Sequence, residues 1–415
     1  MRRQRACRRV VLATLVAFSA FAFAPISGAN GPPPGDLPNA PADPDNLSAE
    51  QWSLAQIRAF EAHAITGGSP LVRVALIDSG IDPGHPEFAG RIDTANSVSC
   101  ATGVPVRDPS GALWRDQIAH GTQVAGIVAA GDNGFGIVGV APHVQLLIVK
   151  VANAGQPITP AATACAFEYV ATQQIDVANA SFAVDKGPTG GADPLDFFCH
   201  NVKADKESIK LVKDAVREAR KSGATVVASA GNNNLDMAHP PTGNECIRMP
   251  VELPGVIGVS SDGRLGQRAS TPPVASNYGV GVIDVTAPGG DPAQGGVPGG
   301  LILSTFPSYI AIPPTAMPNI VDGSPGATYR YTAGSSFAAA HASGVAALIV
   351  SRYGDLRSPW NGKLPPGFVK ALLQATAEPK PCPPDPQCEG GEGYNGFFGH
   401  GEVDALNAVL HEPAP

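Results

Sequence analysis

The sequence predicts an α/β fold in which a mostly parallel, twisted sheet carries helices on both faces. Short apolar runs alternate along the chain with longer segments of helical composition. The first run, residues 74–77, is apolar throughout, as in a strand buried on both faces. Such alternation favours parallel strands joined by crossover helices, with ligand sites at the carboxyl ends of the strands.

The expected elements follow this alternation from the first strand onward. Residues 72–77 form a strand that ends at Asp78, and a helix at 123–130 follows His120. Further strands are expected at 144–149, 177–181, 225–228, 256–259 and 283–287, and further helices at 163–173, 207–222, 337–352 and 367–376. The Pro- and Gly-rich insertions within 271–332 are expected to form surface loops.

Composition indicates a folded chain with a sizeable core, and the spread of motifs along the chain favours one large domain. Of 415 residues, 43% are hydrophobic and 15% charged, which is enough apolar material for a sizeable core. The 48 Gly and 41 Pro indicate many turns and long loops. A net charge of −8 leaves no basic stripe, so nucleic acid is not an expected partner. We expect a single domain over residues 51–415 that acts as a monomer without stable membrane association.

The N-terminus has the pattern of a secretory signal peptide over residues 1–29. A basic start precedes an apolar run at 10–23 and a small-residue cleavage signal at 27–29. A membrane anchor is the alternative, although the run is shorter than the roughly 20 residues that span a bilayer. Residues 30–50 are expected to form a flexible Pro- and Gly-rich leader, which is too short for a folded prodomain.

Six cysteines remain after removal of such a signal, an even number that suits three disulfides in an exported protein. They are Cys100, Cys165, Cys199, Cys246, Cys382 and Cys388. Cys382 and Cys388 frame a short Pro-rich loop and are expected to pair with each other. A zinc cluster is the alternative, but the spacing lacks the paired cysteines of zinc sites.

Three motifs carry side chains suited to nucleophilic catalysis. Asp78 ends the first strand, where a buried carboxylate needs a hydrogen-bond donor such as a histidine N–H. His120 precedes an apolar helix, and the ordinary pKa of an imidazole suits a general base at neutral pH. In residues 334–344 a serine-bearing turn leads into an apolar helix, which places a hydroxyl beside unpaired backbone N–H groups.

In their order along the chain, these motifs resemble the signature blocks of subtilisin-like serine proteases, the subtilases, and the resemblance extends over residues 51–410. It implies that Ser336, rather than Ser335, is the nucleophile of a triad with Asp78 and His120. Phe337 and Ala340 replace the Met and Pro usual in that block, and His341 is interpreted as a packing residue. The segment that ends in Asn232 resembles the block that stabilises the oxyanion.

The same resemblance implies a structural calcium ion in a glycine-rich loop. The expected ligands are the side chains of Gln51, Glu87 and Asn133 and the backbone carbonyls of Gly131, Phe135 and Ile137. A metal-free glycine loop is the alternative.

Substrate is expected to pair with two strands of the enzyme by β-augmentation. The residues implied are Ala154, Gly155, Ser181, Phe182, Ala183, Gly231 and Arg248. Arg248, next to an expected cis peptide at Met249–Pro250, stands where the family usually has a small residue at the floor of the primary pocket. No acidic residue adjoins Arg248 in sequence, so small or acidic substrate residues are expected there. The alternative is that Arg248 points to solvent. Cys199 and Cys246 lie in insertions near this cleft and are expected to pair.

These features predict a secreted serine endopeptidase, extracellular or periplasmic, that acts on polypeptides. A processing protease with a narrow substrate range is one alternative. A catalytically silent subtilase fold used for binding is another, although the complete triad disfavours it.

Overall fold

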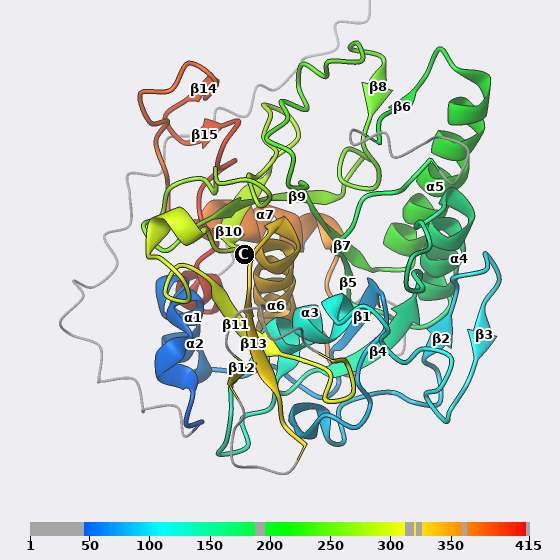
Figure 1. The fold of residues 1–415 in the computed structure, drawn as a ribbon, viewed down its shortest axis with the longest axis vertical. Coiled ribbons are helices and arrows are strands. Elements are labelled where there is room, and N and C mark those ends of the chain that lie inside the picture. Colours follow the sequence, from blue (N-terminus) through cyan, green and yellow to red (C-terminus); the bar gives the residue numbers. More distant parts are fainter. Residues whose placement is uncertain (1–44, 187–195, 312–318, 321–325, 359–362, 412–415) are drawn as a thin grey trace, which may run out of the picture. The chain divides into compact units, whose positions relative to one another are not determined.

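The computed structural model describes residues 45–186, 196–311, 319–320, 326–358 and 363–411 (Figure 1). The predicted signal peptide and most of the predicted leader lie outside these ranges and stay predictions. Residues from Pro41 onward cluster as one unit. Within the described ranges, every helix is too short or too polar to cross a membrane.

A sheet of eight strands lies at the centre of the fold, in the order β10-β9-β7-β5-β1-β4-β2-β3. The strands are β1 (Arg73–Asp78), β2 (Val98–Ser99), β3 (Val106–Arg107), β4 (Gln145–Lys150), β5 (Val177–Ala180), β7 (Thr225–Ser229), β9 (Ile257–Asp262) and β10 (Val285–Pro288). Neighbouring strands pair in parallel except β2 and β3, which are antiparallel. The predicted mostly parallel sheet is therefore confirmed.

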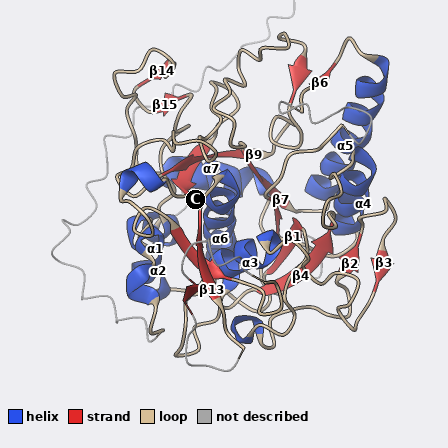
Figure 2. Ribbon diagram, viewed as in Figure 1, coloured by secondary structure: helices blue, strands red, loops and turns tan. Residues whose placement is uncertain are grey.

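Helices cover both faces of this sheet, as predicted (Figure 2). They are α1 (Trp52–Gln56), α2 (Ala59–His63), α3 (His120–Ala129), α4 (Pro160–Ala171), α5 (Lys203–Lys221), α6 (Ser335–Tyr353), α7 (Pro366–Thr376) and α8 (Ala405–Leu410). In β1, Val74 and Leu76 belong to the core formed with α3, α6 and α7. Ala75 and Ile77 belong to the core formed with α4 and α5. Burial on both faces explains why this strand is apolar at every position from 74 to 77.

Helix α6 runs through the first of these cores, and its residues from Ser335 to Val350 are all buried. Such a helix must be apolar on every side, and its many alanines are strong helix formers that allow neighbouring backbones to approach closely. At Gly344 even a Cβ would lie 2.5 Å from Val140, so larger residues cannot fit there. The helix ends before Gly354, which has extended backbone geometry.

A second, antiparallel sheet lies within residues 271–332, and for its strands the prediction of surface loops was wrong. It consists of β11 (Ile302–Thr305), β12 (Asn319–Ile320) and β13 (Tyr329–Thr332). Buried Tyr329 and Tyr331 alternate with the half-buried Arg330 and Thr332, the pattern of a strand with one buried face. Four residues give too short a pattern to stand out among the surrounding prolines and glycines.

Short elements complete the described chain. They are the 3₁₀ helices η1 (Ser48–Glu50), η2 (Pro86–Phe88) and η3 (Pro292–Gln294), and the strand pairs β6 (Phe198–Cys199) with β8 (Cys246–Ile247) and β14 (Gly390–Gly391) with β15 (Tyr394–Asn395). The backbone N–H of Leu47 donates to the Gly136 carbonyl at 2.8 Å, so the end of the predicted leader already contacts the domain.

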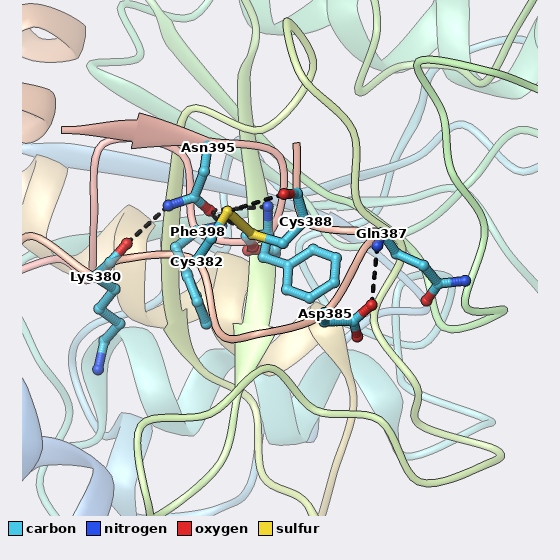
Figure 3. The surroundings of a disulfide bond; sticks show 9 residues. Lys380, Cys382, Asp385, Gln387, Cys388, Asn395 and Phe398 are labelled. Carbon is cyan, nitrogen blue, oxygen red and sulfur yellow. Dashed lines mark hydrogen bonds between the residues drawn. A yellow bond between two sulfur atoms is a disulfide. The ribbon is translucent and has the colours of Figure 1, made fainter. Parts of the chain in front are cut away.

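Three disulfides link the six cysteines. Cys382 pairs with Cys388 and Cys199 with Cys246, which confirms both predicted pairings, and Cys100 pairs with Cys165. Figure 3 shows the small loop closed by the first of these bridges, beside Asn395. The Asn395 amide donates to the Lys380 carbonyl at 2.7 Å and fastens the start of this loop.

Candidate active site

Asp78 and His120 are joined by a hydrogen bond. Strand β1 ends at Asp78 near the middle of the sheet, and α3 begins at His120. The Asp78 Oδ1 atom accepts from His120 Nδ1 at 2.8 Å and from the Ser79 backbone N–H at 2.7 Å. A proton held on Nδ1 leaves Nε2 as the basic nitrogen of the neutral ring. Asp78 is buried, whereas the His120 side chain is 32% exposed and can meet a reactant.

Position 121 requires glycine for this contact to form. A Cβ there would lie 2.1 Å from the Gly80 carbonyl oxygen and 3.1 Å from Asp78 Oδ1. The first distance is far inside van der Waals contact, so any larger residue would push α3 away from β1. The glycine that follows His120 in the motif is therefore needed for packing.

Charges around the imidazole raise the pKa of His120 above its usual value. Burial lowers this pKa, because it disfavours the imidazolium. The negative charge of Asp78, its hydrogen bond to the ring and the charge of Asp116 raise it, and together they outweigh burial. The site is thus arranged to stabilise a positive charge on His120.

Ser336 is the second residue of α6 and lies at the same end of the sheet. Its hydroxyl donates to the Ser181 carbonyl at 3.0 Å, and the Ser181 hydroxyl donates to the Ser336 carbonyl at 2.8 Å. In the described chain the Ser336 hydroxyl is thus bonded to Ser181 and not to His120. The next residue, Phe337, lies with its ring centroid 5.7 Å from that of His120, which places the start of α6 beside the imidazole.

Asn232 lies in the loop after β7 and faces the start of α6. Its side-chain oxygen accepts from the Ser335 backbone N–H at 2.8 Å, and the Gly231 N–H donates to the Ser335 hydroxyl at 2.9 Å. With the oxygen so engaged, the amide NH₂ of Asn232 is the group left to bind a ligand. The Ser336 N–H, in the first turn of α6, has no intrahelical acceptor. These two donors suit the stabilisation of an oxyanion.

Sequence reasoning missed Asn277, which holds the Asn232 loop in place. Its buried side chain accepts from the N–H groups of Asn233 and Leu235, both at 2.9 Å, and donates to the Ala230 carbonyl at 2.9 Å. A single Asn within a Pro- and Gly-rich stretch carries no recognisable motif. Only the fold reveals its role.

His341 is unsuited to act as a second base. It is fully buried on α6, and its Nδ1 donates to the Phe337 carbonyl at 2.8 Å. Burial lowers the pKa of His341 to about 4, so the ring stays neutral and fixed. These contacts agree with its interpretation as a packing residue.

One group of the predicted substrate-binding residues lies next to Ser336. Ser181, Phe182 and Ala183 directly follow β5, and Ser181 contacts Ser336 as described above. Ala154 and Gly155 form an exposed turn after β4. Ala154 and Gly155 are thus accessible, whereas Val151 and Ala152 are buried, and the pairing of a peptide along this segment stays a prediction.

Arg248 is buried with its guanidinium directed toward the active-site loop. Only 4% of it is exposed, and its Nη2 lies 3.6 Å from where a Cβ of Gly231 would stand. The expected cis peptide at Met249–Pro250 is present. Contrary to the sequence expectation, acidic residues are close: the charges of Asp185 and Glu252 both interact with Arg248. Asp185 is distant from Arg248 in sequence. A turn of the chain brings the Glu252 carboxylate close to residue 248, where it accepts from the Arg248 backbone N–H at 2.5 Å.

The predicted calcium ligands come together around one loop, but their side-chain oxygens are engaged by protein donors. Glu87 accepts from the Tyr329 hydroxyl at 2.6 Å, the Ile137 N–H at 3.0 Å and the Asn133 amide at 2.9 Å. The Asn133 oxygen accepts from the Phe135 N–H at 3.2 Å. The Gln51 side chain both accepts from and donates to the backbone of Val138.

A calcium ion needs about six to eight oxygen ligands. The arrangement at this loop does not fit one, because N–H and O–H groups point at the oxygens that would bind it. The Arg91 guanidinium also lies within 3.0 Å of where a Cβ of Gly131 would stand, and its positive charge opposes a second cation. In the described structure Glu87, Asn133 and Tyr329 close the loop by hydrogen bonds instead.

Comparison with known proteins identifies a matching family and several relatives. The family model described as "Subtilase family" matches residues 70–401. Subtilisin NAT of Bacillus subtilis subsp. natto is 30% identical over 302 residues, which are 73% of this chain and 61% of that protein. Fervidolysin of Fervidobacterium pennivorans is 28% identical over 373 residues, 89% of this chain and 45% of that protein. The chain thus matches less than two thirds of the length of these relatives.

A solved structure supports the fold. The crystal structure of a lanthipeptide protease matches with a TM-score of 0.69 at 24% identity, over 89% of this chain and 96% of that one. The central sheet and its helices are therefore subtilisin-like. Because the family model covers most of the chain, and its motifs converge on one site, the chain belongs to the subtilase family of serine proteases.

Proposed function

We propose that the protein is a secreted serine endopeptidase. Ser336 attacks the carbonyl carbon of a peptide bond, His120 Nε2 takes the hydroxyl proton, and Asp78 holds the imidazole and stabilises its positive charge. The Asn232 amide and the Ser336 N–H stabilise the oxyanion. His120 then gives its proton to the leaving amine, and water hydrolyses the acyl-enzyme by the reverse sequence of transfers.

The observation that carries this proposal is the hydrogen bond of 2.8 Å between His120 Nδ1 and Asp78 Oδ1 beside the start of α6. It sets the tautomer that a general base requires. The Ser336 hydroxyl must turn from the Ser181 carbonyl to His120 before it can react. This change requires at least a rotation of the Ser336 side chain.

A serine-directed phosphonate tests the proposal directly. We expect one covalent adduct per chain by intact mass, located at Ser336 by peptide mapping, and none in Ser336→Ala. His120→Ala should retain the hydroxyl but label far more slowly, because the base is lost. A folded wild-type protein that neither labels nor cleaves a casein substrate would instead favour a catalytically silent subtilase fold used for binding.

Export is part of the proposal, and two features support it. Residues 1–29 have the pattern of a signal peptide, and the described chain contains three disulfides, which persist in oxidising compartments. N-terminal sequencing of protein collected from the medium or periplasm should find residues 1–29 removed. Protein retained in the cell with reduced cysteines would contradict export.

We also propose that substrate residues immediately before the cleaved bond are small. The Arg248 guanidinium lies beside Gly231, and Ala183 occupies a position where the family usually has glycine. Both would narrow the primary pocket. Asp185 lies close enough for its charge to act on Arg248, and Glu252, whose pKa burial raises to about 7, adds a partial negative charge at neutral pH, so an acidic substrate residue is not needed to balance Arg248. Calcium has no part in this proposal.

A further inference from the structure

Asp116 is a buried carboxylate between β1 and α3 that belongs to none of the recognised motifs. Only 1% of it is exposed. Its backbone N–H donates to the Ile81 carbonyl at 2.9 Å, which ties residue 116 to the turn after Asp78. A buried carboxylate is costly unless hydrogen bonds compensate its loss of hydration. The hydrogen-bond donors that stabilise the buried Asp116 carboxylate lie around His120.

Five hydrogen bonds end on the Asp116 carboxylate. The Oδ1 atom accepts from the Ser79 hydroxyl at 2.9 Å and from the N–H groups of Ile118 and Ala119 at 2.9 and 3.0 Å. The Oδ2 atom accepts from the N–H and the hydroxyl of Thr122 at 2.9 and 2.6 Å. One side chain thus binds residues on both sides of His120 and the residue that follows Asp78.

The backbone that Asp116 holds is strained. Ala119 has φ 75°, a left-handed conformation that residues other than glycine rarely adopt. Such a conformation persists only when the surroundings enforce it, and it is often found at functional sites. The bond from the Ala119 N–H to Asp116 enforces it directly. This turn sets the direction in which the His120 side chain points from the backbone.

A second link runs from Asp116 to Asp78 through one hydroxyl. The Ser79 hydroxyl donates to Asp116 Oδ1 and accepts from the Gly121 N–H at 2.9 Å. The Ser79 backbone N–H donates to Asp78 Oδ1. The base and its orienting carboxylate are therefore held in one network.

We propose that Asp116 is a positioning residue for His120, whose buried carboxylate fixes the strained turn and favours the imidazolium formed during catalysis. This role rests on the proposed function of His120 as general base. Asp116 itself contacts neither substrate nor the reacting atoms.

Other charged groups near Asp116 do not replace its effect. Lys150 is buried and donates to the Arg115 carbonyl at 2.7 Å, and Arg115 stacks on the Tyr309 ring at 3.5 Å. Burial raises the pKa of Tyr309 to about 12, so it stays neutral, and its hydroxyl donates to the Asp116 carbonyl at 2.9 Å. Asp82 accepts from Ser308. Asp78 and Asp116 are the carboxylates whose charges act on His120.

Asp116→Asn keeps the shape of the side chain and removes its charge. Its amide nitrogen would face the Thr122 donors or those of Ala119, so the turn loses at least one bond. We expect kcat to fall roughly 10- to 100-fold with little change in KM, as for a small misplacement of a catalytic group. The acid limb of kcat/KM should move to lower pH, since loss of a negative charge lowers the pKa of His120.

Asp108→Asn is the matched control, because it removes a half-buried carboxylate of the same loop that accepts from Ser110 and Leu113 rather than from the turn before His120. It should change neither kcat nor the acid limb. A purely structural role of Asp116 would reduce the amount of folded enzyme but leave the pH limb of the remaining activity in place. Unchanged kcat and an unchanged acid limb in folded Asp116→Asn would overturn the proposal.

Titration by NMR separates this inference from the proposed function. In a Ser336→Ala background, which cannot digest itself, the His120 resonance is assigned by its loss in His120→Gln. Its pKa should fall on addition of Asp116→Asn, whether or not the protein cleaves peptides. An active wild-type enzyme whose His120 titrates identically in both backgrounds refutes the inference alone, whereas an inactive wild type refutes the proposed function.

If Asp116→Asn does not fold, Thr122→Val still tests whether Asp116 positions His120. It removes the hydroxyl bond to Asp116, together with the bond that this hydroxyl accepts from the Asp82 N–H at 3.0 Å, and preserves both carboxylates. We expect kcat to fall while the acid limb stays in place. Full activity in this variant would contradict a positioning role.

Discussion

In the proposed mechanism Ser336 and Asn232 act on the same intermediate, and the loss of each should reduce activity to a different extent. Ser336→Ala removes the proposed nucleophile, and we expect a loss on the order of 10⁶-fold in kcat, the magnitude known for subtilisin. Asn232→Ala removes one oxyanion donor, for which about 10²- to 10³-fold is the subtilisin figure. Both variants should keep the wild-type melting temperature within a few degrees, because neither side chain belongs to the apolar core.

Ser351→Ala is the control for the first variant. Ser351 also lies on α6, but its hydroxyl donates to the Ala347 carbonyl within the helix. Peptidase assays with these purified variants should show wild-type rates for Ser351→Ala alone. Turnover by Ser336→Ala above the background of a mock purification would show that another residue is the nucleophile.

Arg248 tests the proposed specificity at the level of one side chain. Arg248→Gly removes bulk and charge, and the preference before the cleaved bond should shift toward larger apolar residues. Arg248→Met removes the charge but keeps most of the bulk, so it should retain the preference for small residues. Cleavage-site profiling on a peptide library distinguishes these outcomes, with the exposed Arg264→Gly as control. Wild-type cleavage mainly after aromatic residues would contradict this assignment.

Glu87 controls the loop at residues 131–137. Burial raises the pKa of Glu87 from 4.5 to about 7, although hydrogen bonds from Tyr329, Ile137 and Asn133 lower it. Between these two pH values the folded state holds a proton that the unfolded state has released. The free energy of unfolding should therefore fall as pH rises through this window, by at most on the order of 3 kcal/mol.

Urea unfolding between pH 4.5 and 8 measures this effect in the Ser336→Ala background. Glu87→Gln should flatten the pH dependence, because its amide does not titrate. Calcium or a chelator should leave the melting temperature unchanged, since protein donors engage the Glu87 and Asn133 oxygens. A melting temperature that rises with calcium concentration would support the calcium site predicted from the sequence.

Helices and strands that are long, or apolar at every position, could be predicted from the sequence. The strand at 73–78 and the helix at 335–353 appear in the structure within a few residues of their expected bounds. Helix α3 begins three residues earlier than expected, at His120, because Asp116 binds the N–H groups that start it. The pair β11 and β13 was missed, since each strand has only four residues and its partner is distant in sequence.

The same distinction holds within the site. Asp78, His120 and Ser336 lie in recognisable motifs, so they could be named from sequence. Asn277 and Asp116 are isolated polar residues in loops, and their partners become clear only when the chain is folded. The acidic neighbours of Arg248 were missed for the same reason.

The three disulfides constrain the whole molecule to different degrees. Cys100–Cys165 closes 65 residues of chain, whereas Cys382–Cys388 closes only 6. Loop-closure entropy predicts a loss of about 4 kcal/mol when the first pair is replaced by serine and about 2 kcal/mol for the second. Chemical denaturation of the two double variants should rank them in this order. Equal losses would mean that native contacts, rather than chain entropy, determine the effect.

The reciprocal bonds between Ser181 and Ser336 have a consequence for how reactivity is switched on. A peptide that lies along residues 181–183 offers its own N–H groups to the carbonyl that now holds the Ser336 hydroxyl. We therefore expect substrate binding to free the Ser336 hydroxyl to turn toward His120, so that the substrate itself activates the nucleophile. Without a bound peptide, Ser336 should have low reactivity. We expect small acylating reagents to react more slowly with Ser336 than extended peptidyl reagents of equal electrophilicity.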